Sequence, residues 1–312
     1  MNRILSFLLA VLSTLVVFAQ QEPQFSQNMF NKLANNPGFS GSSGGVATSV
    51  LHRSQWMGFS DNGAAVSTQN FSVDAEVPFL NGGLGLNIVK DNVAQFSNLA
   101  INSSYAFRTQ LGIGQIGMGI SVGIFQSGLE GGFLRSAQSN DPAIPTGDVS
   151  GSKLDIGAGL YFNNDDMYIG ISSAHMTEPI IEWSDGQDFN LSRHYFLIAG
   201  SSHKLDPMFS LNPSIYLKAD GATSQLDINT NLIYNNKIWG GVTYRLDEGL
   251  ILLTGMNLKS NKSKQYDDMR IGIAYDVTMV NPMGNSLEIM LGYNFKIKTT
   301  KAISKYKNPR FL

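Results

Sequence analysis

Apolar and polar residues alternate with a period of two along most of the chain, which is the spacing of a β-strand whose two faces meet different surroundings. Residues 286–297 are the clearest example. One face carries Leu287, Ile289, Leu291, Tyr293 and Phe295, and the other carries Ser286, Glu288, Met290, Gly292, Asn294 and Lys296. Residues 153–162, 225–234 and 270–277 repeat the pattern. The alternation predicts an all-β fold.

Turn-forming residues divide the alternating region into fourteen expected strands, most of them about 9 to 13 residues long. The expected strands are residues 46–53, 64–76, 83–90, 96–108, 112–124, 153–163, 166–175, 191–203, 208–220, 222–234, 237–246, 249–258, 267–277 and 286–297. The odd-numbered connections include the two longest, residues 125–152 and 176–190, whereas most even-numbered connections are short turns. Long loops on one side and short turns on the other are typical of a bacterial outer-membrane barrel.

Composition helps to separate a membrane barrel from a β-sandwich, which also alternates with a period of two. Only 15% of the residues are charged, whereas a soluble domain has about 25%. The polar faces hold mainly Asn, Ser, Gly, Asp and Lys, which suits a polar lumen. The expected strand lengths also approach the roughly 9 to 11 residues that a tilted spanning strand needs. The sequence therefore favours a transmembrane antiparallel β-barrel of about 14 strands over a sandwich.

Aromatic residues gather near the expected strand ends, where a barrel places girdles at the two membrane interfaces. The expected girdle positions are Phe107, Tyr161, Phe162, Tyr195, Tyr234, Trp239, Tyr244, Tyr266, Tyr275 and Tyr293.

The N-terminus has the parts of a secretory signal peptide. Arg3 precedes the apolar run 4–18, which is too short for a spanning helix of about 20 residues, and Ala19 ends a small-residue cleavage site. We therefore expect residues 1–19 to be a signal peptide, 20–45 a periplasmic or lumenal segment, 46–297 the barrel and 298–312 a C-terminal tail. Both mature termini are then expected in the periplasm, with outer-membrane lipid around the strands. The chain has no Cys, so disulfides do not stabilise it.

The net charge of −2 conceals a basic C-terminus. Residues 296–312 have no acidic residue and contain Lys296, Lys298, Lys301, Lys305, Lys307 and Arg310. The tail is either a solvated extension or a tether to an acidic periplasmic partner, and Arg310 and Phe311 are its candidate partner-binding residues. The near-neutral balance of the whole chain is unlike that of a nucleic-acid-binding protein.

The connection at residues 176–190 is acidic and carries Glu178, Glu182, Asp185 and Asp188. Calcium needs about six to eight converging oxygens, and these carboxylates lack a recognisable loop spacing. A solvated loop that binds divalent cations weakly, or that meets a partner through Glu178, Glu182 and Asp185, is the favoured interpretation over a metal site.

No motif for catalysis is present. The four His residues fall on different expected strands, and the sequence lacks a GxSxG elbow, an HExxH pair and a phosphate loop. Residues 112–117 match GxGxxG, but they lie in an expected strand with no helix after it, so strand glycines are the better interpretation. We expect no enzymatic activity and no cofactor, with an outer-membrane hydrolase as the minor alternative.

A series of motifs resembles one known family. The chain contains PQFSQNMFN at residues 23–31, NPGFSG at 36–41 and RSQWMGF at 53–59. Further motifs are SRHYF at 192–196, KIWGGVTYR at 237–245, RIGIAYD at 270–276, LEIMLGY at 287–293 and PRFL at 309–312. In this order they resemble the PorP/SprF family of Bacteroidetes outer-membrane proteins, whose pattern opens with QFSQYM, NPAYAG and RxQWxGF. Asn28 and residues 38–40 depart from that pattern.

The resemblance implies a non-enzymatic barrel of the type IX secretion and gliding apparatus. Its expected partners are a secreted adhesin with a C-terminal targeting domain, which the barrel helps to export or anchors, and periplasmic proteins of the machinery. Arg53, Gln55 and Trp56 form a candidate partner-binding cluster after the first strand, although a lumenal Arg and a girdle Trp explain the same residues. The alternative functions are a passive or substrate-specific channel, and a scaffold that meets periplasmic partners through the tail.

Overall fold

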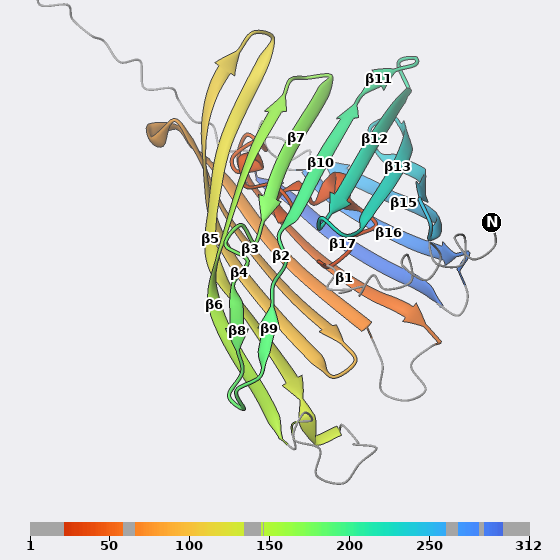
Figure 1. Ribbon diagram of the computed structural model, residues 1–312. Helices are drawn as coiled ribbons and strands as arrows, with labels where there is room; N and C mark the ends of the chain where they lie inside the picture. Colours follow the sequence, from red (N-terminus) through yellow and green to blue (C-terminus); the bar gives the residue numbers. More distant parts are fainter. Residues whose placement is uncertain are drawn as a thin grey trace, which may run out of the picture.

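The computed structural model describes residues 22–58, 66–133, 145, 147–259, 268–280 and 284–295, which form a closed antiparallel β-barrel (Figure 1). The first barrel strand pairs with the last, from Val46 opposite Phe295 onward, and the strands on either side of residues 202–208 pair with each other as well. The sheet therefore has no open edge around its circumference, and a closed sheet satisfies the backbone hydrogen bonds that hydrocarbon cannot. Among the described residues, no helix is long and apolar enough to cross a membrane.

Fourteen strands make up the barrel. They are β1 (Val46–Met57), β2 (Val66–Val77), β3 (Gly82–Val93), β4 (Phe96–Leu111), β5 (Gly114–Glu130), β6 (Asp148–Asn163), β7 (Met167–Ala174), β10 (His194–Ser201) with its extension β11 (His203–Lys204), β12 (Phe209–Ala219), β13 (Ser224–Tyr234), β14 (Ile238–Arg245), β15 (Gly249–Lys259), β16 (Asp268–Thr278) and β17 (Asn285–Phe295). Short helical turns follow β2 at η4 (Pro78–Leu80) and β5 at η5 (Gly131–Phe133).

The expected fourteen-stranded antiparallel barrel is confirmed, but the lengths of the strands beside the long connections differ from those that the alternation indicated. β5 and β6 are longer than expected, whereas β7 and β10 are shorter. β5 continues to Glu130 and β6 begins at Asp148, because Phe125, Leu129 and Val149 pack in one apolar cluster with the next connection. That connection holds a small hairpin of β8 (Ile180–Glu182) and β9 (Asp188–Asn190), which was expected to be irregular. Apolar packing against β5 and β6 stabilises the β8–β9 hairpin, and the alternation of residues along the strands did not indicate this packing.

The two ends of the barrel differ in the connections that they carry. We call the end with the β1–β2, β5–β6 and β7–β10 connections the loop end, and the end where β1 begins and β17 finishes the terminal end. In Figure 1 the β8–β9 hairpin marks the loop end at the bottom of the view, and β11 marks the terminal end.

The alternating faces of β17 separate lipid from lumen as expected. Ile289, Leu291 and Tyr293 point outward and are between 40% and 48% exposed. Glu288 and Met290, at the opposite parity, are 0% and 1% exposed and face the lumen. The low charge of the sequence is explained by this division, since one face of every strand is apolar toward lipid.

The girdle prediction is wrong for Tyr161 and Trp239. Both side chains are buried inside the barrel, at 3% and 2% exposure, because they have the parity of the inward face, whereas their neighbours Leu160 and Ile238 point outward. Other expected girdle residues are exposed, and these are Phe107, Tyr195, Tyr234, Tyr244, Tyr275 and Tyr293. Tyr266 lies outside the described residues.

The lumen is occupied by the N-terminal residues 22–45, which we call the plug. Three short turns shape it, namely η1 (Asn28–Phe30), η2 (Lys32–Ala34) and η3 (Pro37–Phe39). They are the red coils that lie within the ring of strands in Figure 1. The expected signal peptide 1–19 and the expected tail 298–312 lie outside the described residues.

A charge on the outward face of a central strand position should destabilise the barrel. Ile289→Arg, near the middle of β17, is expected to lower the free energy of unfolding by about 2–4 kcal/mol, since Arg at the bilayer midplane costs this much on a lipid-facing strand. Denaturant titration of the barrel in lipid vesicles measures the change. Ala222→Arg in the exposed β12–β13 turn serves as the control, and equal stability of the two variants would contradict the outward placement of Ile289.

Candidate functional site

Backbone contacts seat the plug against the inner wall of the barrel. A Cβ on Gly119 would lie 2.4 Å from the nitrogen of Gly38, and a Cβ on Gly83 would lie 2.4 Å from the Cα of Gly41. Gly41 also has a φ of 75°, a backbone conformation that glycine adopts without steric cost. The glycines of the plug motif NPGFSG and of strands β3 and β5 therefore allow two backbones to touch where no side chain would fit.

Asn36 fixes the turn that makes these contacts. Its Oδ1 accepts a hydrogen bond of 2.8 Å from the backbone N–H of Gly38, which caps η3, and Pro37 occupies the first position of the turn. The Nδ2 of Asn36 donates to the carbonyl oxygens of Leu160 and Ile171. Asn36 thus joins the plug to β6 and β7 and shapes it at the same time.

Apolar residues of the plug cover apolar positions of the inward face. Met29 packs with Trp239 and the inward side chains of β15, and the rings of Phe30 and Trp239 lie 4.9 Å apart. Phe25 packs with Leu51 and Met290 in a separate cluster. These inward apolar side chains would be costly beside an aqueous channel, so they match a lumen filled by protein.

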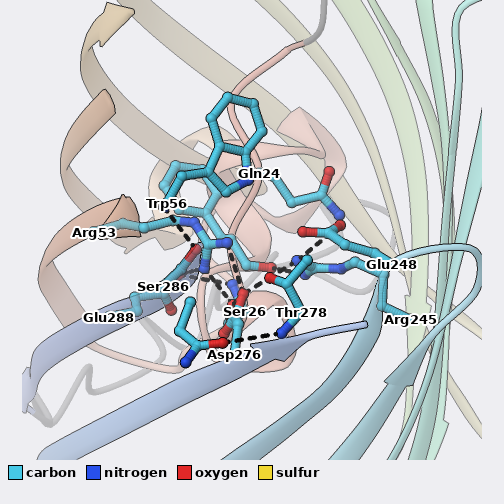
Figure 2. Close-up of polar contacts among 12 residues, drawn as sticks. Gln24, Ser26, Arg53, Trp56, Arg245, Glu248, Asp276, Thr278, Ser286 and Glu288 are labelled. Atoms are coloured by element: carbon cyan, nitrogen blue, oxygen red, sulfur yellow. Dashed lines mark hydrogen bonds and ion pairs between the residues drawn. The ribbon is translucent and has the colours of Figure 1, made fainter. Parts of the chain in front are cut away.

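A cluster of buried charges holds the start of the plug, as Figure 2 shows. Arg53 of β1 pairs with Asp276 of β16 at 2.7 Å and with Glu288 of β17 at 3.5 Å. The two oxygens of Glu288 accept hydrogen bonds from the backbone N–H groups of Ser26 (2.7 Å) and Gln27 (2.8 Å). The Ser26 hydroxyl donates to Asp276 at 2.8 Å and also contacts the Arg53 guanidinium.

Arg245 extends this ionic cluster toward β13. Its guanidinium pairs with Asp227 at 2.9 Å and with Asp276 at 3.4 Å, and it donates to the backbone oxygen of Phe25. Asp227 also accepts a hydrogen bond from the side chain of Asn28. Two cations and three carboxylates are thus buried together. N–H groups of the plug donate to the carboxylates the hydrogen bonds that the two cations do not supply. The hydrogen bonds of the plug therefore help to stabilise the buried charges of the wall.

Neutralising one member of the ionic cluster should destabilise the protein strongly. Asp276→Asn leaves Arg53 and Arg245 without their shared carboxylate, and removing one partner of a buried pair costs about 3–5 kcal/mol. Denaturant unfolding in vesicles measures the loss. Lys153→Met is the matched control, because it breaks an exposed ion pair to Glu182 that is worth at most about 1 kcal/mol. Similar losses in both variants would contradict the role of the cluster.

A second set of polar contacts holds the first described residue of the plug near the loop end. The Glu22 carboxylate lies 3.1 Å from Nε2 of His175, whose Nδ1 lies 3.0 Å from Asp155. The Lys218 ammonium donates to the backbone oxygen of Glu22 and to the side chain of Gln24. Burial alone would raise the pKa of Glu22, but the charge of His175 and its hydrogen bond lower it to about 2. Burial lowers the pKa of His175, but Glu22 and Asp155 outweigh burial and raise it to about 10.

These pKa shifts predict how stability depends on pH. The contribution of His175 is complete below its unfolded pKa of about 6.5 and is lost as the pH rises through about 10. The contribution of Glu22 is present above its unfolded value and is lost as the pH falls through about 2. The stability difference between the native protein and His175→Gln should therefore be largest near pH 5–6 and shrink toward pH 10, as unfolding measured across this range can verify. A difference that grows with pH would refute the pairing.

A cavity of about 830 Å³ lies between the plug and the mouth of the barrel at the loop end. We call it the loop-end cavity. Its floor includes Glu22 and Gln24 of the plug, beside Lys218 and Glu248. Its apolar wall consists of Trp56, Val66, Val89, Val93, Phe96, Ala100, Phe125, Trp183, Phe189 and Leu191. An aromatic wall with a charged floor suits a chain segment that carries large apolar side chains and a few polar groups.

The structure separates the three residues of the candidate cluster on β1. Gln55 and Trp56 line the loop-end cavity. Arg53 lies deeper in the lumen, and its side chain is fully buried in the ionic cluster. A partner at the barrel surface therefore does not reach its guanidinium in this conformation. The three residues are close in sequence, but they face two different surroundings.

The acidic candidates lie on the outside of the loop end and pair with nearby groups. Glu178 lies 3.6 Å from Arg193, Glu182 lies 3.4 Å from Lys153, and Asp185 accepts a hydrogen bond from the backbone of Gln187. No cluster of three or more metal-ligating residues occurs in the described part of the chain. Arg310 and Phe311 lie outside the described residues.

Sequence reasoning missed the residues that complete the ionic cluster. Asp227, Asp276 and Glu288 were expected on the polar face of their strands, but no role was given to them. Arg245 was noted only as part of a motif. The available signal was a charged residue at inward parity within a spanning strand, which is costly unless it is paired.

The geometry defines a class of protein, namely a membrane β-barrel with a plugged lumen and a recess at one mouth. The family model of the type IX secretion system membrane protein PorP/SprF matches residues 17–308, and the chain belongs to this family. The family is one of secretion-system membrane proteins, and the fold is that of outer-membrane barrels. Among curated protein sequences, none matches this chain significantly.

Solved structures with a similar fold are outer-membrane barrels. The toluene transporter TbuX of Ralstonia pickettii has a TM-score of 0.50 and 12% identity, over 83% of this chain and 92% of that chain. The toluene transporter TodX of Pseudomonas putida has a TM-score of 0.47 and 11% identity, over 89% and 95% of the two chains. A FadL homologue of Pseudomonas aeruginosa has a TM-score of 0.46 and 8% identity, over 80% and 89%. At such identities the likeness shows the barrel fold alone.

Proposed function

We propose that this protein is a plugged docking barrel of the outer membrane, which helps to export or anchors a secreted surface protein through that protein's C-terminal targeting domain. In this proposal both termini are periplasmic, so the loop end faces the cell exterior. Membership of the type IX secretion family supports a role in protein secretion. The plug supports docking over free passage, because residues 22–45 occupy the lumen and are tied to the buried ionic cluster of the wall by hydrogen bonds.

The loop-end cavity is the proposed docking site. It joins aromatic side chains, which supply large contact area with few rotatable bonds, to a polar floor formed by the plug. Trp56 and Trp183 stand among its lining residues, and tryptophan is the type of residue that most often dominates a binding interface. The acidic hairpin β8–β9 borders the same mouth and offers a charged rim.

Replacing Trp56 should therefore weaken retention of the partner. Trp56→Ala is expected to cost about 2 kcal/mol of binding free energy or more, which is roughly a thirtyfold rise in Kd. The measurement is the amount of secreted protein held on whole cells against that in the medium. Cells that lack the barrel gene should release or fail to export one surface protein, and Trp56→Ala should reproduce part of that loss.

His52→Ala provides the matched control on the same strand, because His52 is exposed on the outward face of β1. It should retain the partner as the native barrel does. If the surface protein stays on the cells after deletion of the gene, the docking function is wrong. If Trp56→Ala and His52→Ala behave alike while deletion removes the partner, docking takes place elsewhere on the barrel.

A channel is the alternative function, and the names of several similar structures are those of transporters. Conductance in planar bilayers distinguishes the two. A docking barrel with its plug in place should be silent when purified intact, whereas a channel should give a large steady current.

A further inference from the structure

A second recess lies at the terminal end of the lumen, on the other side of the plug from the loop-end cavity. Its volume is about 400 Å³, and we call it the terminal-end pocket. Turns η1 and η2 of the plug and strands β1, β16 and β17 contribute to its lining. Two basic side chains, Lys32 from η2 and Arg270 from β16, face it together.

Lys32 is held by aromatic rings rather than by a carboxylate. Its Nζ lies 3.5 Å from the centroid of the Tyr168 ring and 5.8 Å from that of Phe39. Within the described part of the chain it has neither an ion pair nor a hydrogen-bond acceptor. Cation–π contacts position the ammonium group, but they leave its N–H donors without an oxygen partner there.

Arg270 is arranged in the same way. Its guanidinium carbon lies 4.2 Å from the centroid of the Phe30 ring, and its Nε donates to Asn257 at 2.9 Å. None of the ion pairs among the described residues includes it. The ring of Phe30 fixes the plane of the guanidinium while its terminal amino groups stay available for the oxygens of a carboxylate or a phosphate.

None of the ion pairs among the described residues joins an acid of the pocket to either of these two cations. Asp74 accepts hydrogen bonds from the backbone N–H of Gly41 and the hydroxyl of Ser43, both in the plug. Asp268 stands two positions before Arg270, has contacts of its own and attracts Arg270 through its charge, but the two side chains do not form an ion pair. Burial, with the nearby charge of Arg270, lowers the pKa of Lys32 to about 7. Two like charges thus share a partly buried space and destabilise each other.

We propose that the terminal-end pocket is an anion-binding site, in which a carboxylate or phosphate group accepts hydrogen bonds from Lys32 and Arg270. Such a group balances the two positive charges and uses donors that no described residue satisfies. Asn236 and Asn257 in the lining supply neutral amide donors for the remaining oxygens. The site is separate from the proposed docking at the loop end, and neither inference depends on the other.

Binding of two probes to the full-length barrel in maltoside micelles tests the site. The probes are inorganic phosphate and an acetylated tetraglutamate peptide, which represent a free or lipid phosphate and an acidic protein segment. Isothermal titration calorimetry should show binding of at least one probe to the native protein. Lys32→Met and Arg270→Gln should each weaken that binding about tenfold or more, because each removes charged hydrogen bonds. Lys32→Arg retains the charge and should keep most of the affinity.

Lys237→Met is the matched control, because Lys237 is an exposed basic residue in the β13–β14 turn at the same end. It should bind both probes as the native protein does. Heat-dependent migration on gels establishes that each variant is folded. Loss of binding that is confined to Lys32→Met and Arg270→Gln supports the site, and the preferred probe identifies the source of the anion. Absence of binding of both probes, or an equal loss in Lys237→Met, would overturn it.

Discussion

Hydrocarbon offers no partner to a backbone N–H or C=O, and this constraint determines the architecture from which the other features follow. The sheet has to close, as it does where β1 meets β17 and β10 meets β12. A closed ring of fourteen strands encloses more space than its own inward side chains fill. The plug fills the middle of that space, and its glycine contacts show that the fit is made at the level of the backbone.

The plug and the wall depend on each other electrostatically. Glu288 is fully buried, and two of the hydrogen bonds that its carboxylate accepts come from the backbone of Ser26 and Gln27. Without the plug, Glu288 would keep only a long contact with Arg53, and Asp276 would lose the Ser26 hydroxyl. A buried charge is tolerated only when its hydrogen-bonding capacity is met. The N-terminal segment is therefore a structural element of the barrel rather than a mobile stopper.

The strand faces could be derived from the sequence because a period of two assigns every residue to one side. The same rule places Trp239 inside, since it follows the outward Ile238. The residues that pair inside the barrel could not be derived in this way. Arg53 and Asp276 are 223 positions apart, and their contact depends on barrel closure and on register. The extensions of β5 and β6 were missed because apolar packing under the β8–β9 hairpin sustains them.

Trp56 shows how one local irregularity joins the wall to the loop-end cavity. Arg53 and Gln55 have inward parity, so regular alternation would direct Trp56 toward lipid. The register of β1 against β17 shifts between Ser54 and Met57, and Trp56 adopts a φ of 53°. A left-handed conformation costs a bulky residue about 1–2 kcal/mol, and its backbone N–H is held by the hydroxyl of Ser286 at 3.1 Å. Bulges at barrel rims change the direction in which side chains point. The bulge in β1 directs the indole of Trp56 into the lining of the loop-end cavity instead of toward the membrane. Strained backbone of this kind clusters at functional sites, so the left-handed Trp56 at the mouth of the loop-end cavity agrees with the docking role that we propose for that cavity.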